Sequence, residues 1–162
     1  QSFAVHEFAP PGDIAALRGE VRAFLAKHQP EAAPEDRANC WQVADPAFSK
    51  AAGAAGFLGF TWPGQYGGHE RHLLERYIVL EEMLSAGAPV GAHWIADRQT
   101  GPLLLRYGTE EQRQKYLPGM AAGTTYACIG LSEPNAGSDL ASVRTAARKT
   151  DKGWVINGQK IW

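Results

Sequence analysis

The residues that could most clearly bind a ligand lie in a polar loop that directly follows a short apolar run. The loop is Ser132-Glu133-Pro134-Asn135-Ala136-Gly137-Ser138-Asp139. It combines hydroxyl side chains at Ser132 and Ser138 with Gly137, where the backbone can come close to a ligand. Such a loop can present N–H groups and hydroxyls to a phosphate or to the polar edge of a ring. Taken alone, the same residues are also compatible with a capped surface turn that binds nothing.

Other polar groups in the sequence have simpler interpretations than catalysis. His69 and His72 are spaced like a metal pair, but they stand at the start of an expected helix, where a solvated face explains them. Glu81 and Glu82 are adjacent, so a helix directs them about 100° apart and they are interpreted as ordinary helix residues. We therefore expect no metal site. The basic residues Arg144, Arg148, Lys149 and Lys152 are interpreted as a solvated face, with a nucleotide contact as the alternative.

The composition is that of an ordinary globular protein, with 44% hydrophobic residues, 20% charged residues and a formal net charge of −1. This charge provides no field that would attract nucleic acid or an anionic membrane. No apolar run approaches the roughly 20 residues that span a bilayer. Residues 1–11 lack the basic and apolar parts of a secretion signal, and Cys40 and Cys128 are expected to be free thiols. We therefore expect a cytoplasmic protein.

The secondary structure that must position the loop is predicted to change near Thr124. Before this residue, apolar side chains recur at helical spacing. Asp13 is a plausible N-cap, Pro46 suits a first helical position, and Thr109 with Gln112 forms a capping box. The pattern predicts helices over residues 13–28, 46–56, 70–86, 89–107 and 109–118.

After Thr124 the pattern becomes that of β-strands. Strands are predicted over residues 125–131, 143–147 and 154–157, and Asn157-Gly158 predicts a hairpin turn into a last strand over 159–162. A hairpin of this kind needs further strands or a helix to be stable in water. We therefore expect the chain to be truncated, with the remaining polypeptide outside it.

The loop, followed by Gly153-Trp154-Val155-Ile156-Asn157-Gly158-Gln159-Lys160-Ile161-Trp162, strongly resembles the signature of the acyl-CoA dehydrogenase family. Trp62-Pro63-Gly64-Gln65-Tyr66-Gly67-Gly68 resembles the turn before the family's third helix. The segments Gly108-Thr109-Glu110-Glu111-Gln112-Arg113 and Tyr116-Leu117-Pro118 resemble the approach to its β-domain. The order and spacing of these segments agree with the family over most of residues 57–162.

The resemblance implies an α+β fold. An N-terminal all-α helical bundle domain would occupy residues 1–123, and residues 124–162 would form the first strands of a β-barrel-like middle domain. It also implies FAD as the cofactor and acyl-CoA as the substrate. An electron-transfer flavoprotein or a similar acceptor would be a partner, and the assembly would be a homodimer or homotetramer.

The resemblance also assigns site residues. Ser132 would hydrogen-bond the polar edge of the flavin ring, Ser138 would lie near the flavin phosphates and the pantetheine arm of the substrate, and Trp162 would lie beside the flavin. The full set of predicted cofactor-binding residues is Ile129, Leu131, Ser132, Gly137, Ser138 and Trp162, of which Ser138 is also the predicted substrate-binding residue.

The implied reaction is α,β-dehydrogenation of an acyl-CoA thioester, in which a carboxylate removes the α-proton and the β-hydrogen leaves as hydride to flavin N5. In the family the catalytic glutamate belongs to a C-terminal domain, so no catalytic residue is predicted in this chain. Glu133 is interpreted as a structural residue that holds the loop. The alternatives are a flavin oxidase or monooxygenase of the same fold, or a non-catalytic fragment or half of a split flavoprotein. The chain alone is expected to be inactive.

Overall fold

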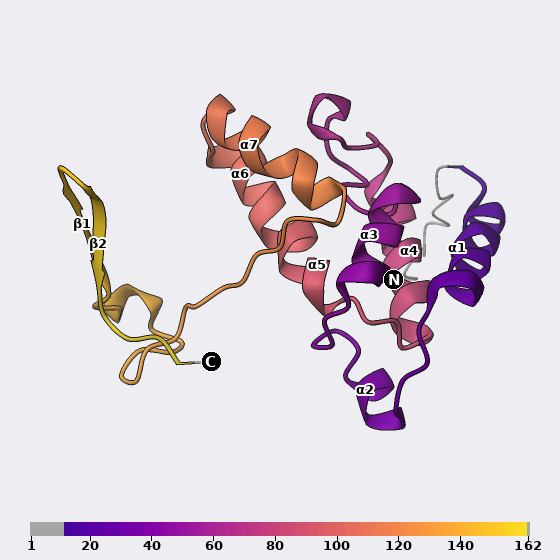
Figure 1. Ribbon diagram of the computed structural model, residues 1–162, viewed down its shortest axis with the longest axis horizontal. Coiled ribbons are helices and arrows are strands. Elements are labelled where there is room, and N and C mark those ends of the chain that lie inside the picture. The colour runs from indigo at the N-terminus through magenta and orange to yellow at the C-terminus, as the bar shows by residue number, and fades with distance from the viewer. Residues whose placement is uncertain (1–11, 162) are drawn as a thin grey trace, which may run out of the picture. The chain divides into compact units, whose positions relative to one another are not determined.

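The computed structural model describes residues 12–161, which fall into a helical unit that ends at Ala127 and a second unit that begins at Cys128 (Figure 1). Residues 1–11, for which no secretion signal was expected, and Trp162 lie outside the described residues. The helices that the structure describes include none long and apolar enough to cross a membrane. The combination of a mostly helical domain with a following antiparallel strand pair confirms the predicted fold class.

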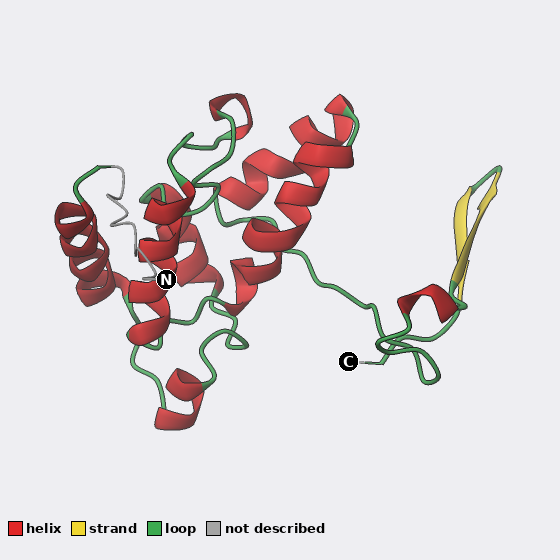
Figure 2. Ribbon diagram, turned by 180° about the vertical axis from the view of Figure 1, so that it is seen from behind, coloured by secondary structure: helices red, strands yellow, loops and turns green. Residues whose placement is uncertain are grey.

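The first unit is built almost entirely from helices and loops, as the colouring of Figure 2 shows. The α-helices are α1 (Ile14–His28), α2 (Pro34–Ala38), α3 (Pro46–Ala54), α4 (Leu73–Ser85), α5 (Gly91–Ile95), α6 (Gly101–Tyr107) and α7 (Glu110–Ala121). A 3₁₀ turn, η1 (Gly64–Tyr66), precedes α4, and a π-helical turn, η2 (Ala96–Thr100), joins α5 to α6.

The helix starts agree with the capping signals in the sequence. The Asp13 carboxylate accepts a hydrogen bond from the N–H of Ala16 at 2.9 Å and begins α1. At the start of α7, the Thr109 hydroxyl accepts from the N–H of Gln112 at 3.2 Å, and the Gln112 amide oxygen accepts from the N–H of Thr109 at 2.9 Å. This is the predicted capping box, and it satisfies backbone donors that have no partner inside the helix.

Some helix lengths differ from the prediction. The helix predicted from residue 70 begins only at Leu73, because Glu70 has a left-handed backbone with φ 52° and His72 is the cap. The helix predicted over 89–107 is interrupted by the π turn. α7 does not stop at Pro118 but continues to Ala121, and the burial of Met120 and Ala121 in the core offsets the N–H that proline cannot donate.

Two clusters of buried side chains form the core of the first unit. The larger joins α1, α3 and α4, with Phe24 in edge contact with Phe57 at 5.1 Å between ring centroids. The smaller surrounds Trp62 and includes Leu117 from α7. Each fully buried side chain of this size contributes about 1.5–3 kcal/mol, so the clusters hold the helices in fixed positions.

The second unit contains one antiparallel strand pair, β1 (Ala146–Thr150) with β2 (Gly153–Asn157), preceded by a 3₁₀ turn, η3 (Leu140–Ser142). Thr150 pairs with Gly153, so the hairpin turn lies at Asp151-Lys152. The hairpin predicted at Asn157-Gly158 is therefore wrong. Gly158 instead passes so close to Thr145 that a Cβ there would lie 2.1 Å from the Thr145 hydroxyl oxygen.

The other predicted strands also differ. Residues 125–131 and 159–161 are not strands, and the strand predicted over 143–147 begins at Ala146. Strand residues need a hydrogen-bonded neighbour, and none of the described residues pairs with these segments as a strand. Their apolar side chains consequently remain exposed, as at Ile129 and Leu131.

Candidate functional site

The loop singled out in the sequence is a closed turn in the second unit. The N–H of Glu133 donates to the carbonyl of Ala136 at 2.8 Å, and the N–H of Ala136 donates back to the carbonyl of Glu133 at 3.1 Å. Ala136 is buried, whereas Gly137 and Ser138, which follow it in the sequence, are exposed. The backbone of the turn is therefore fixed, and the residues that follow it are accessible to a ligand.

The Glu133 carboxylate holds this turn against the rest of the unit. One oxygen accepts from the N–H of Arg144 at 2.7 Å, and the other accepts from the N–H of Thr145 at 2.8 Å and from the Lys160 ammonium at 3.0 Å. The Thr145 hydroxyl, the N–H groups of Arg144 and Thr145 and the Lys160 ammonium lower the pKa of Glu133 to about 2. Such a group stays ionised near neutral pH and is a weak proton acceptor.

Lys160 and Ile161 bring the end of the chain beside the start of the loop. The Lys160 ammonium donates to the carbonyl of Leu131 at 2.9 Å, and the N–H of Ile161 donates to the carbonyl of Ser132 at 3.0 Å. Leu131 and Ser132, both predicted to contact a flavin, are thus fixed next to Ile161, which precedes Trp162 in the sequence. Segments far apart in the sequence converge at this point.

The predicted site residues differ in exposure. Ile129 is 41% exposed and Leu131 is 54% exposed, like other apolar side chains of the second unit such as Trp154 and Ile156. Ser132 is half-buried. A Cβ at Gly137 would meet no atom of the described chain within 4 Å, so the chain itself places no steric demand for glycine there. Trp162 lies outside the described residues.

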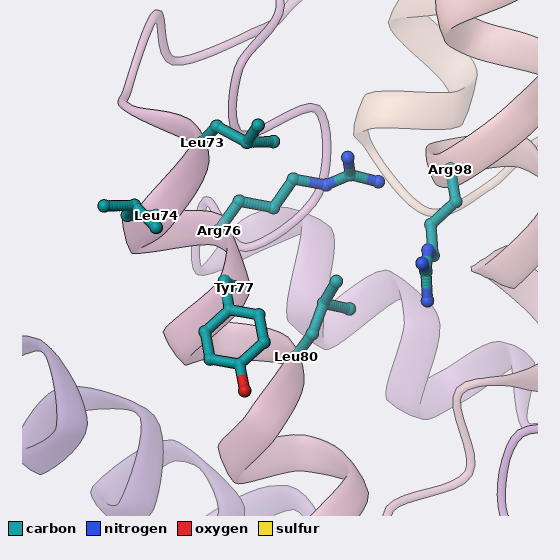
Figure 3. Close-up of a pocket in the computed structure, with 6 residues that line it drawn as sticks. All are labelled: Leu73, Leu74, Arg76, Tyr77, Leu80 and Arg98. Carbon is teal, nitrogen blue, oxygen red and sulfur yellow. The ribbon is translucent and has the colours of Figure 1, made fainter. Parts of the chain in front are cut away.

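The first unit carries a separate apolar hollow of about 260 Å³ along α4 (Figure 3). Figure 3 shows Tyr77 and Leu80 on α4 and the Arg98 side chain descending from the facing segment. The Arg98 guanidinium stacks 4.2 Å from the centroid of the Trp94 ring. An apolar hollow lined also by two arginines can receive a largely apolar ligand. Its lining residues are Leu73, Leu74, Arg76, Tyr77, Leu80 and Arg98.

Sequence reasoning missed the ion-pair network at Glu82. Glu82 was interpreted as an ordinary helix residue, but its side chain is 9% exposed and accepts from Arg18 at 2.5 Å and from Arg22 at 2.7 Å. Arg22 and then Arg18 lower the pKa of Glu82. The 18/22 spacing places both arginines on one face of α1, which was the available signal, but the partner depends on α1 packing against α4.

A second missed group is the buried pair of Ser49 and His93. The Ser49 hydroxyl lies 2.8 Å from Nδ1 of His93, and His93 is 2% exposed. Nε2 of His93 is buried without a hydrogen-bond partner in the described chain. Burial lowers the pKa of His93 to about 4, against a smaller opposing effect of Asp97. His93 thus belongs to the helical core, where its neutral form is favoured.

Of the two histidines near the Gly-Gly turn, His72 has a structural role. Its Nδ1 accepts a hydrogen bond from the N–H of Leu74 at 3.2 Å and caps α4. Over residues 12–161, no cluster of three or more histidine, cysteine or acidic side chains is arranged to hold a metal.

Comparison with protein families agrees with these features. Residues 12–124 match the family described as acyl-CoA dehydrogenase, N-terminal domain, and residues 128–162 match acyl-CoA dehydrogenase, middle domain. The chain therefore belongs to the acyl-CoA dehydrogenase family, as its resemblance implied.

Individual relatives support this assignment. Acyl-CoA dehydrogenase FadE26 of Mycobacterium tuberculosis is 42% identical over 110 residues, which cover 68% of this chain and 27% of that protein. A solved variant of the Tcur3481-Tcur3483 steroid acyl-CoA dehydrogenase is 39% identical with a TM-score of 0.79, over 91% of this chain and 39% of the solved chain. An acyl-CoA dehydrogenase from Bacillus anthracis, solved in complex with FAD, is 26% identical with a TM-score of 0.68, over 99% of this chain and 27% of the other. The chain thus spans well under half the length of these relatives.

Proposed function

We propose that this chain supplies the N-terminal domain and the first flavin-contacting segments of an FAD-dependent acyl-CoA dehydrogenase. The observation that carries the proposal is the convergence of Leu131 and Ser132 with Lys160 and Ile161. It brings the segments predicted to contact one flavin ring to the same place. The relative solved with FAD supports the same cofactor.

The exposed groups at this place suit a flavin. Ile129 and Leu131 offer apolar surface of the kind that a planar ring covers, and the hydroxyls of Ser132 and Ser138 form no hydrogen bond with another described residue. A ring with one polar edge and a phosphate-bearing tail matches that combination of apolar surface and hydroxyl donors. We assign Ser132 to the polar edge, Ser138 with Gly137 to the phosphates and the pantetheine arm, and Trp162 to the side of the ring.

The proposed reaction removes the α-proton and the β-hydrogen of an acyl thioester. FAD, when bound, supplies the acceptor for the β-hydride. The role of this chain is to bind and orient the acyl thioester and FAD. Its best-placed carboxylate, Glu133, holds the loop through its hydrogen bonds and is therefore not assigned as the base. The base that accepts the α-proton is assigned to a part of the longer protein outside this chain.

The acyl group and the partners are also proposals. The names of the relatives range from isovaleryl-CoA dehydrogenase to a steroid acyl-CoA dehydrogenase, so we propose no acyl size. The hollow beside Tyr77 and Leu80 is a candidate for the apolar part of the acyl group. An electron-transfer flavoprotein or a similar acceptor would reoxidise the cofactor, and we propose a homodimeric or homotetrameric assembly.

The test is product analysis with the full-length protein and a panel of straight-chain, branched and steroid-derived acyl-CoA thioesters. With an artificial electron acceptor and no oxygen, mass spectrometry is expected to show a thioester product that has lost two hydrogens. Turnover that requires oxygen and yields hydrogen peroxide or a hydroxylated product would favour an oxidase or monooxygenase. A lack of turnover with every thioester would favour a non-catalytic protein.

A further inference from the structure

Polar side-chain contacts of the second unit form a clamp, and we propose that this clamp sets the reactivity of the flavin site. The clamp consists of Glu133 and Lys160. In this role they are positioning residues that act through Ser132 and do not themselves touch substrate. This inference rests on the proposed function.

The geometry of the clamp fixes three consecutive residues. The carbonyl of Leu131 is held by Lys160, the carbonyl of Ser132 by the N–H of Ile161, and the side chain of Glu133 by Lys160 and by the backbone of Arg144 and Thr145. Ser132, in the middle, has its backbone fixed on both sides. The clamp therefore fixes the position from which the hydroxyl extends and limits the donor to the few places that the side-chain rotamers reach.

Lys160 is the part of the clamp that joins the two segments through a side chain. Its ammonium is 3.0 Å from a Glu133 oxygen and 2.9 Å from the Leu131 carbonyl oxygen, so a single cation holds both ends of the Ser132 segment. The side chain of Glu133 is 8% exposed and that of Lys160 is 31% exposed. A charge-assisted contact of this kind is shorter and more directional than a neutral one.

The setting of the clamp argues against a purely stabilising role. Over residues 128–161, Glu133 and Ala136 are the only buried residues, so Glu133 is a buried charge in a unit with almost no apolar core. Because its partner Lys160 is exposed, the ion pair itself contributes little to stability, but a charged pair can specify one local geometry. Positioning explains why a charged pair occupies this place.

The experiment compares full-length variants by stopped-flow reduction with an acyl-CoA substrate identified by the product analysis. Lys160→Met removes the cation and leaves the backbone hydrogen bonds to Glu133, whereas Lys160→Arg keeps a cation. Lys27→Met, at an exposed position in the last turn of α1, is the matched control. Each variant is also measured for flavin content, thermal unfolding temperature and flavin midpoint potential.

We expect Lys160→Met to retain bound FAD and to lower the reduction rate at saturating substrate by roughly 10- to 100-fold, since small misplacements near a reacting centre have effects of this size. The midpoint potential should shift with the rate, and Lys160→Arg should recover most of the loss. Wild-type reduction rate and potential in Lys160→Met would overturn the inference, even if its unfolding temperature fell. Complete loss of flavin in Lys160→Met but not in Lys160→Arg would also overturn it, because the pair would then serve binding alone.

The failure of the proposed function gives a different result. If the wild-type protein binds no FAD, or if no acyl-CoA reduces the bound flavin, the proposed function fails and this inference fails with it. If wild type is active and Lys160→Met is equally fast, only the positioning role is lost.

Discussion

The buried imidazole of His93 makes the stability of the helical unit depend on pH in a calculable way. Burial lowers the pKa of His93 from 6.5 to about 4 in the folded state. Between these values the unfolded chain binds a proton that the folded chain excludes, so stability is fully present above the unfolded pKa and is lost as pH falls from 6.5 towards 4. Over the whole range the loss is about 3 kcal/mol, and between pH 7 and pH 5 it is about 2 kcal/mol.

Urea unfolding of the chain, followed by tryptophan fluorescence at pH 7 and pH 5, measures this loss. The comparison is with His93→Asn, which keeps a polar group near Nδ1 for the Ser49 hydroxyl but does not titrate in this range. Wild type should lose about 2 kcal/mol more than His93→Asn when the pH is lowered. Ser49→Ala, the matched control, should cost about 1 kcal/mol at both pH values and keep the pH dependence. Equal losses in wild type and His93→Asn would refute the burial argument.

The remaining predictions concern the core and the two carboxylates with lowered pKa. Leu117→Ala should destabilise the chain by about 2–5 kcal/mol in urea unfolding, because Leu117 is fully buried. The control, Tyr107→Ala at an exposed position, should cost less than about 0.5 kcal/mol. Equal losses of stability in the two variants would contradict the core assignment. Glu82→Gln should lower the thermal unfolding temperature more at pH 7 than at pH 3, since Arg22 and Arg18 lower the pKa of Glu82 and its contribution shrinks as pH falls from 4.5 towards the folded-state pKa. An equal effect at both pH values would mean that the charge is unimportant. The amide proton of Thr145 should titrate by NMR with a midpoint near pH 2, the value to which the pKa of Glu133 is lowered, and a midpoint near 4.5 would show that the carboxylate is not held as described.

The sequence predicted the features that depend only on neighbouring residues. The starts of α1 and α7 follow from side chains that cap the nearest backbone donors, Asp13 and Thr109, so they need no knowledge of the fold. The end of α7 was not predictable in this way. It extends past Pro118 because Met120 and Ala121 enter a core formed by distant parts of the chain.

The hairpin shows how a strong local turn signal can fail. Asn157-Gly158 is a strong turn signal, but the turn forms at Asp151-Lys152, where Gly153 adopts a positive φ of 125°. In place of the predicted turn, Gly158 packs against Thr145, which lies 13 positions earlier in the sequence. Sequence patterns rank such alternatives poorly, because they do not contain these contacts.

The candidate site also has a part that the sequence predicted and a part that it did not. The loop around Ser132 was recognisable because its residues are contiguous, and family resemblance strengthened the interpretation. The partnership of Glu133 with Lys160 was not recognisable, because 27 residues separate them and no periodicity relates their positions. The cofactor-binding roles of Ile129, Leu131, Ser132, Gly137, Ser138 and Trp162 stay predictions.

The measurement that tests the central proposal most directly is the visible absorbance spectrum of the purified full-length protein before and after anaerobic addition of an acyl-CoA thioester. The proposal predicts one FAD per polypeptide, with bands that bleach when the thioester is added and return when an electron acceptor follows. A protein that carries no flavin, or whose flavin no acyl-CoA thioester reduces, would contradict it.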